Sequence, residues 1–236
     1  MSAEMPTIFE EGQVLLFDKP LYWTSFDLVN KVRIMIRSTF GIKKIKVGHA
    51  GTLDPLASGL MIICTGKCTK KIDEFRDLDK EYIATFHLGA TTPSFDLETE
   101  TDNVYPTDHI NQDMVKKALE SFLGEQKQLP PMYSAKQIDG KRAYEYARKG
   151  IQKELVPVTV FFREIELLSF SIPDIKIRLV CSKGTYIRSF ARDFGQALKS
   201  GSYLAALERT SIGSFHVKNA YSLEKFQEYI EQMQQN

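Results

Sequence analysis

Residues 47–64 place the tightest limits on how this chain can fold. The first part is rich in glycine, which tolerates backbone angles that other residues avoid, and Pro55 fixes its own φ and biases Asp54 away from the helical region. The second part, residues 60–64, is a short apolar run typical of a buried strand. We therefore expect Asp54 to lie on a rigid, irregular loop anchored by a core strand, an arrangement that can present a nucleophile.

Composition limits the class of protein. The 236 residues are 43% hydrophobic, enough for a sizeable core, and no repeat or Pro/Ser-rich linker divides them, so we expect a single domain over 1–236. No apolar run approaches the roughly 20 residues that span a membrane, and residues 1–13 lack the features of a signal peptide. We expect a cytoplasmic protein with reduced cysteines, whose spacing does not suit a zinc site.

Charge is unevenly distributed along the chain, although the formal net charge is only +1. Residues 31–50 and 136–153 are basic, whereas residues 96–102 are acidic. A charged run is usually a solvated face, but two basic segments in one chain suit a surface that contacts phosphates. The basic side chains are Lys31, Arg33, Arg37, Lys43, Lys44 and Lys46 in the first segment, and Lys136, Lys141, Arg142, Arg148, Lys149 and Lys153 in the second.

Hydrophobic periodicity predicts an α+β protein. Alternation and apolar runs predict strands at 14–17, 60–64, 80–89, 156–162, 165–170 and 175–181, the last three paired antiparallel because their connections are short. Helical spacing predicts four helices. The first is capped by Thr24 and Asp27 and has the apolar residues Phe26, Val29, Val32 and Ile36, and the second, over 111–124, is capped by Asn111. The third has the apolar residues Ile187, Phe190, Phe194 and Leu198, and the fourth is capped by Ser222 and has Leu223, Phe226, Ile230 and Met233.

Four motifs resemble those of one enzyme family. Residues 48–59, Gly-His-Ala-Gly-Thr-Leu-Asp-Pro-Leu-Ala-Ser-Gly, resemble the active-site motif of the tRNA pseudouridine-55 synthases, the TruB family. Residues 182–188, the Lys80-x-Tyr82 pair and residues 207–215 resemble further family motifs, so that the similarity covers about 13–230. The departures are Tyr22 in place of a glycine, Pro93 and Ser94 in a loop to which we assign no chemistry, and Gln137 in place of a lysine.

The resemblance implies a pseudouridine synthase fold, with a mixed, mostly antiparallel sheet flanked by helices. It also implies a basic, RNA-gripping insertion at about 126–153 and, because the chain stops at Asn236, no C-terminal PUA domain. The implied activity is isomerisation of uridine 55 in the T-loop of tRNA, by base flipping and exchange of the C1′–N1 bond for a C1′–C5 bond. No cofactor, metal or protein partner is implied, and we expect a monomer that binds the T-arm of tRNA.

The resemblance also assigns roles to residues. Asp54 attacks the sugar or acts as a base there, Tyr82 stacks on the flipped base, His49 fills its place in the RNA, and Tyr186 and Leu207 help to hold it. Arg188 is expected at the first turn of a helix, where a cation is unfavourable, so we expect an anionic partner and choose Asp54. The expected phosphate contacts are Lys19, Lys43, Lys44, Lys46, Lys141, Arg142 and Arg148.

Two other functions fit part of the sequence. A glycoside hydrolase needs a pair of carboxylates, and no second acid lies in a glycine-rich context like that of Asp54. A non-catalytic RNA-binding protein or tRNA chaperone would explain the basic segments, but it has no use for Asp54 beside Arg188. An assay for pseudouridine separates this alternative from the synthase.

Overall fold

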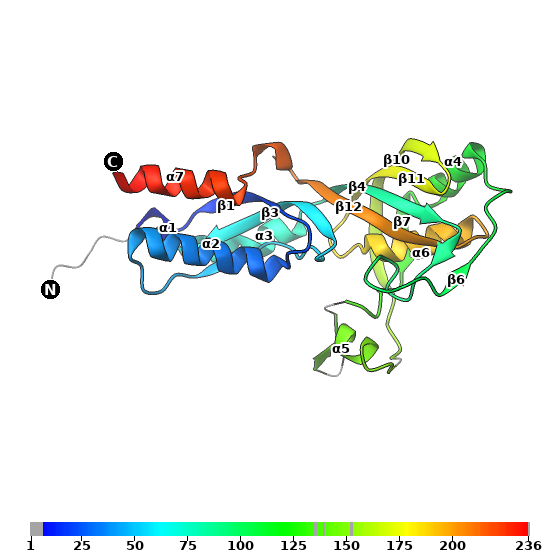
Figure 1. Ribbon diagram of the computed structural model, residues 1–236, viewed down its shortest axis with the longest axis horizontal. Coiled ribbons are helices and arrows are strands. Elements are labelled where there is room, and N and C mark those ends of the chain that lie inside the picture. Colours follow the sequence, from blue (N-terminus) through cyan, green and yellow to red (C-terminus); the bar gives the residue numbers. More distant parts are fainter. Residues whose placement is uncertain (1–6, 135, 139, 152, 236) are drawn as a thin grey trace. The chain divides into compact units, whose positions relative to one another are not determined.

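The computed structural model describes residues 7–134, 136–138, 140–151 and 153–235 (Figure 1). The chain forms two compact units, the first from Met1–Lys80 with Glu208–Asn236 and the second from Glu81–Leu207. The first unit is thus built from both ends of the sequence. The expected single domain stays a prediction, because two such units can act as one catalytic domain.

The first unit is built around β3, which pairs antiparallel with β1 on one side and with β2 at its end. Its sheet has the order β1-β3-β12, with β13 paired to β12. The strands are β1 (Val14–Lys19), β2 (Val47–His49), β3 (Ala57–Thr65), β12 (Ser202–Ile212), which begins in the second unit, and β13 (Phe215–His216). The helices are α1 (Ile8–Glu11), α2 (Ser25–Phe40), η1 (Gly66–Lys71), α3 (Ile72–Asp77), η2 (Val217–Asn219) and α7 (Leu223–Gln235).

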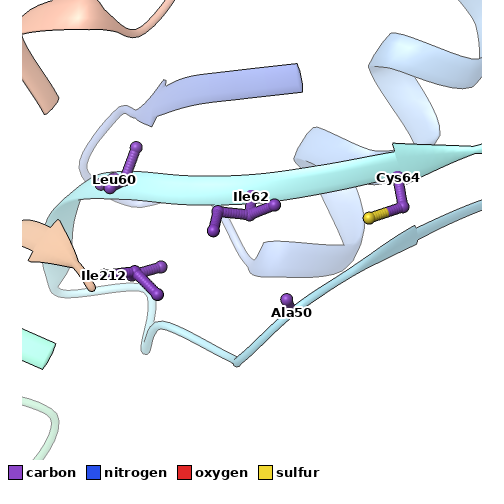
Figure 2. Packing of buried hydrophobic residues seen from close by; sticks show 5 residues of the cluster. All are labelled: Ala50, Leu60, Ile62, Cys64 and Ile212. Atoms are coloured by element: carbon purple, nitrogen blue, oxygen red, sulfur yellow. The ribbon is translucent and has the colours of Figure 1, made fainter. Parts of the chain in front are cut away.

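The expected core strand after Asp54 is confirmed and extends further, from Ala57 to Thr65. Its side chains are buried almost throughout because other elements cover both of its faces. Figure 2 shows one cluster on this strand, where the aliphatic side chains of Leu60 and Ile62 lie near Ile212 of β12. The strand therefore gives the Asp54 loop a rigid base.

Helix α2 begins at the expected cap. The hydroxyl of Thr24 accepts a hydrogen bond from the Asp27 backbone N–H at 3.0 Å, and the Asp27 carboxylate accepts one from the Thr24 N–H at 2.9 Å. The buried face of α2 includes Val29, Val32 and Ile36, as its spacing predicts. Phe26, which the same spacing groups with them, is instead 67% exposed.

The second unit is a mostly antiparallel sheet with the order β12-β4-β11-β10-β7. Its strands are β4 (Lys80–Leu88), β5 (Ala90–Thr91), β6 (Asn103–Val104), β7 (Gly124–Gln128), β8 (Gln137–Ile138), β9 (Lys141–Arg142), β10 (Val158–Ser171) and β11 (Asp174–Cys181). Its helices are α4 (Gln112–Ser121), α5 (Ala143–Ala147) and α6 (Ile187–Ala197). The core includes Phe86 of β4 against Phe190 and Phe194 of α6, with ring centroids 5.4 and 6.0 Å apart.

Two sequence predictions in this unit need correction. The strands expected at 156–162 and 165–170 form one strand, β10, because register shifts after Phe162 and Leu167 absorb the polar interruption while pairing with β11 continues. The helix expected over 111–124 ends at Ser121, and Leu123 is exposed because Gly124 already starts β7.

The helices at the two other expected positions are confirmed. Helix α6 buries Ile187, Phe190 and Phe194, and α7 buries Phe226 and Ile230, with the Ser222 hydroxyl accepting a hydrogen bond from the Lys225 backbone N–H. Among the described residues, every helix is too short or too polar to cross a membrane.

Candidate active site

The loop that carries Asp54 is held at three points. The Ser25 hydroxyl, at the start of α2, accepts a hydrogen bond from the Leu53 N–H at 2.8 Å and donates one to the Leu53 carbonyl at 2.9 Å. The Tyr22 N–H donates to the Pro55 carbonyl at 2.8 Å, and the Ala57 N–H donates to the Asp54 carbonyl at 3.1 Å. The rigid loop expected from the glycines and Pro55 is therefore also fixed from outside, by the side chain of Ser25 and the backbone of Tyr22.

Two buried cations, Lys19 and Arg209, come from distant parts of the sequence and interact with this loop. Lys19 is fully buried, and its ammonium donates to the carbonyls of Pro20 and Trp23 at 2.8 and 2.7 Å. Burial lowers the pKa of Lys19 to about 8, while the negative charge of Asp54 acts in the opposite direction. Arg209, 1% exposed, donates to the carbonyls of Leu60 at 2.7 Å and Gly51 at 3.2 Å.

The position of Lys19 does not fit its expected contact with a phosphate, because a fully buried ammonium does not face solvent. Its charge instead supports the Asp54 loop from inside. Arg209 is a residue that sequence reasoning passed over, although it lies within the motif at 207–215. Its partners, Leu60 of β3 and Gly51 of the loop, are 149 and 158 positions away in sequence, so only the fold reveals the contacts.

His49 ends β2, and the irregular loop that leads to Asp54 follows it directly. Burial lowers its pKa below the usual range, and the cations of Arg209 and Arg76 act in the same direction, against a backbone hydrogen bond with Gly51. Its ring is therefore held in the neutral form. Among the described residues, Nδ1 of His49 is one of the buried side-chain atoms without a hydrogen-bond partner.

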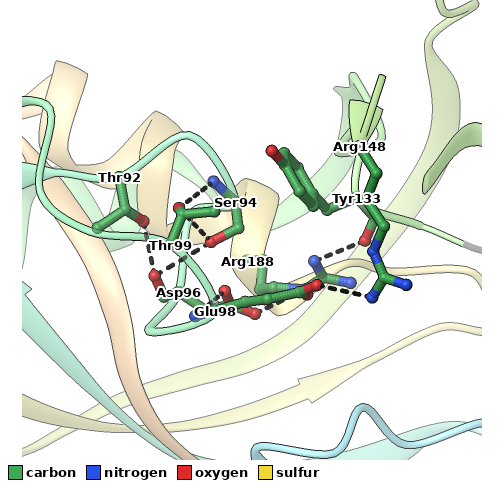
Figure 3. Close-up of polar contacts among 8 residues, drawn as sticks. All are labelled: Thr92, Ser94, Asp96, Glu98, Thr99, Tyr133, Arg148 and Arg188. Carbon is green, nitrogen blue, oxygen red and sulfur yellow. Dashed lines mark hydrogen bonds and ion pairs between the residues drawn. The ribbon is translucent and has the colours of Figure 1, made fainter. Parts of the chain in front are cut away.

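In the second unit, Arg188 lies at the first turn of α6, as expected, and is 5% exposed. Its Nε lies 3.5 Å from an Asp96 carboxylate oxygen, and its Nη1 donates to the Tyr133 carbonyl at 2.7 Å (Figure 3). Its expected anionic partner, Asp54, belongs to the first unit, so that pairing stays a prediction. Asp96 is an anion that the sequence reasoning did not assign.

The loop around Asp96 is braced by hydroxyl groups (Figure 3). Thr92 and Ser94 donate to the Asp96 carbonyl at 2.7 and 3.2 Å, and the Asp96 carboxylate accepts from the Glu98 N–H at 2.9 Å. Thr99 also bonds Ser94. The loop with the departures Pro93 and Ser94 is therefore ordered and aims a carboxylate at Arg188. That the loop carries no chemistry of its own stays a prediction.

The other expected base-contacting residues are all in the second unit. Tyr82 is 8% exposed on the inner face of β4, the face on which alternation places it with Ala84 and Phe86. Tyr186 caps α6, and its backbone N–H and carbonyl are both bound by the side-chain amide of Gln128, at 2.8 and 3.1 Å. Leu207 lies half-buried in β12.

The remaining expected phosphate contacts are exposed. Lys43, Lys44 and Lys46 lie between α2 and β2 in the first unit. In the second unit, Lys141 and Arg142 form β9, and Arg148 follows α5, where it lies 5.4 Å above the Tyr144 ring and 3.2 Å from the Glu98 carboxylate. Ala135, Asp139 and Gln152 of the expected insertion lie outside the described residues. Lys136, beside the departure at Gln137, donates to the Val156 carbonyl at 3.0 Å.

Across the described part of the chain, no group of three or more His, Cys, Asp and Glu side chains is arranged to hold an ion. The described cysteines, Cys64, Cys68 and Cys181, are free thiols.

The fold is that of the pseudouridine synthases. The chain aligns with Cbf5-containing structures, at 25% identity and a TM-score of 0.66 for an archaeal box H/ACA sRNP Nop10-Cbf5 complex, and at 27% and 0.69 for a Cbf5-Nop10-Gar1 complex. Each alignment covers 94% of this chain, which spans 54% and 55% of those longer chains.

Sequence comparisons identify the family more narrowly. Residues 37–187 match the model of the N-terminal domain of the TruB family pseudouridylate synthases. Proteins named tRNA pseudouridine synthase B from Phocaeicola vulgatus and Parabacteroides distasonis are 58% and 57% identical, with 96% and 95% of each chain covered. The chain belongs to the TruB family of pseudouridylate synthases, and it is therefore an enzyme of the isomerase class.

Proposed function

We propose that this enzyme isomerises uridine 55 in the T-loop of tRNA to pseudouridine. The names of its relatives support tRNA as the substrate class. The enzyme would flip the uridine out of the RNA, because the reacting atoms are inaccessible in a stacked base. The C1′–N1 bond then breaks, the uracil rotates, and a C1′–C5 bond forms. C5 gives up its proton and N1 gains one, so that the product is an isomer of uridine. Such a protein would meet its tRNA in the cytoplasm.

The observation that carries this proposal is the environment of Asp54. Its loop is fixed by Ser25 and Tyr22, and its charge interacts with the buried ammonium of Lys19. An opposite charge nearby favours the ionised form of a carboxyl group. An ionised, fixed carboxylate suits either role considered for Asp54, attack on the sugar or removal of a proton from it.

The other residues take supporting roles. Arg188 would stabilise negative charge at the reacting centre, and Asp96 orients its guanidinium through their ion pair. Tyr82 would stack on the flipped uracil, while Tyr186 and Leu207 hold its edges. His49 would occupy the space that the base leaves, a role that its neutral ring suits because it meets neighbouring bases by stacking.

The test is Asp54→Asn, assayed on an unmodified tRNA transcript by tritium release from C5 and by mass spectrometry. The amide keeps the size of the side chain but is neither a nucleophile nor a base, so turnover should fall by several powers of ten while tRNA binding changes by only a few-fold. Asp113→Asn, on the exposed surface of α4, is the matched control and should keep wild-type turnover. A near-wild-type rate for Asp54→Asn would refute the assigned role.

A further inference from the structure

Tyr22 combines two features that rarely occur together. Its φ is +66°, a backbone conformation uncommon for residues other than glycine, and its side chain is 79% exposed. Packing in the core therefore does not explain why a large aromatic residue occupies this strained position. Backbone strain at an exposed residue points to a functional constraint.

The location of Tyr22 suggests what that constraint is. Its N–H donates to the carbonyl of Pro55, the residue next to Asp54, so its backbone belongs to the support of the catalytic loop. Leu21 is 49% exposed and Phe26, at the first turn of α2, is 67% exposed. Ser25, between these residues, binds the same loop through Leu53. We call Leu21, Tyr22 and Phe26 the Tyr22 cluster.

Basic residues follow the Tyr22 cluster along α2 and in the segment after it. Arg33 and Arg37 follow Phe26 by seven and eleven residues, so the three side chains share one face of α2, with about 10 Å of helix between Phe26 and Arg33. Lys43, Lys44 and Lys46 follow in sequence and are exposed. An exposed aromatic ring on the same helix face as guanidinium groups matches the chemistry of single-stranded RNA, whose bases stack and whose phosphates are anionic.

We propose that Tyr22, together with Phe26, stacks on an unpaired nucleobase of the tRNA loop, beside the uridine presented to Asp54. This inference rests on the proposed function and adds a substrate contact to it. The Tyr22 ring fixes the flanking nucleotide, and the Arg33 and Arg37 face of α2 receives the adjoining phosphates. The contact acts on binding and positioning, whereas Asp54 performs the chemistry.

The first experiment compares Tyr22→Gly with Tyr22→Phe in binding and turnover of a T-arm stem-loop RNA. Glycine adopts a positive φ without strain, so Tyr22→Gly should fold at least as well as the wild type while lacking the ring. We expect its Kd and KM to rise about tenfold, within the range for loss of one base-aromatic contact, with kcat within about twofold. Tyr22→Phe should restore wild-type values, because it keeps the ring. Ile34→Ala, which trims an exposed apolar residue elsewhere on α2, is the control and should change neither constant.

The second experiment identifies the contact through the RNA. A set of stem-loops, each with one abasic loop nucleotide, is bound by the wild type and by Tyr22→Gly in a double-mutant cycle. At one position, loss of the base should weaken wild-type binding about tenfold but leave Tyr22→Gly binding nearly unchanged. Additive effects at every position would overturn the proposal.

The outcomes separate this inference from the proposed function. If the wild type forms no pseudouridine in the stem-loop or in full tRNA, the proposed function fails. If the wild type is active and Tyr22→Gly binds RNA as tightly as the wild type does, only the stacking proposal fails. If Tyr22→Gly unfolds at a lower temperature than the wild type, Tyr22→Asn replaces it, since asparagine also tolerates this backbone conformation, and the same rise in Kd is expected.

Discussion

The ion pair between Arg188 and Asp96 is the least exposed one described in the second unit, with side-chain exposures of 5% and 6%. At such sites the removal of one partner leaves a desolvated charge, which costs far more than the loss of a surface pair. Asp96 therefore balances the charge of the Arg188 guanidinium and helps to orient it inside the protein. The catalytic role proposed for Arg188 requires both properties.

We predict that Asp96→Asn lowers the free energy of unfolding by about 3 kcal/mol and reduces turnover, because the Arg188 guanidinium loses a buried counter-charge. Urea denaturation and the pseudouridine assay measure the two effects. Glu98→Gln is the matched control, since its pair with Arg148 is solvent-exposed and should be worth less than about 1 kcal/mol. Equal effects of the two variants would contradict the importance of burial.

Lys19 gives a second prediction at the scale of one residue. Its pKa in the folded protein is about 8 and its ordinary value is 10.5, so between these values the unfolded chain binds more protons and stability rises with pH. Relative to Lys19→Met, which has no titrating group at this position, the free energy of unfolding of the wild type should rise by on the order of 1 kcal/mol between pH 8 and pH 9.5. Urea titrations of both proteins across this range measure the gain. If the difference in free energy of unfolding between the wild type and Lys19→Met stays constant or shrinks as the pH rises, the ammonium is not desolvated.

At the scale of elements, the approach of β3 to β12 depends on Gly59. A Cβ at this position would lie 2.4 Å from the Arg209 carbonyl oxygen, and the backbone has φ +102°. We predict that Gly59→Ala costs about 2 kcal/mol or more, and that it displaces Arg209 from the Asp54 loop. Thermal and urea unfolding measure the cost.

Gly41→Ala separates the two causes of this effect. Gly41 ends α2 with φ +66°, yet nothing lies within 4 Å of its added Cβ, so only the backbone strain of about 1 kcal/mol applies. Gly59→Ala should therefore lower turnover in the pseudouridine assay, whereas Gly41→Ala should not. A smaller loss of stability or activity for Gly59→Ala than for Gly41→Ala would contradict the role of the close approach between β3 and β12.

At the scale of the whole molecule, each unit carries exposed basic residues that we propose to contact RNA phosphates, namely Lys43, Lys44 and Lys46 in the first and Lys141, Arg142 and Arg148 in the second. If about five phosphates are neutralised, log K should fall with log salt at a slope of roughly −3.5 to −4.5. Alanine at Lys141, Arg142 and Arg148 together should make the slope shallower by about 2 to 3. Filter binding at several salt concentrations measures it, with alanine at Lys116 and Lys117 of α4 as the control. An affinity independent of salt would exclude this surface.

The sequence by itself determined the features that depend on near neighbours. Glycines and Pro55 predicted the irregular loop of Asp54, and the apolar run after it predicted β3. Hydroxyl and amide caps predicted the starts of three helices at Thr24, Asn111 and Ser222, because such caps are bonds between residues three positions apart. The motifs at 48–59 and 182–188 also identified the family, since they preserve residue types in a fixed order.

The tertiary structure alone decided which side chains meet across the chain. The burial of Lys19, the support of Gly51 by Arg209 and the pairing of Arg188 with Asp96 join segments far apart in sequence, and periodicity carries no record of such partners. The exposure of Phe26 was decided in the same way, because helical spacing gives a face but not what covers it. Desolvation and charge pairing depend on distances through space, so the chemical environment of the site follows from the fold and not from the order of residues.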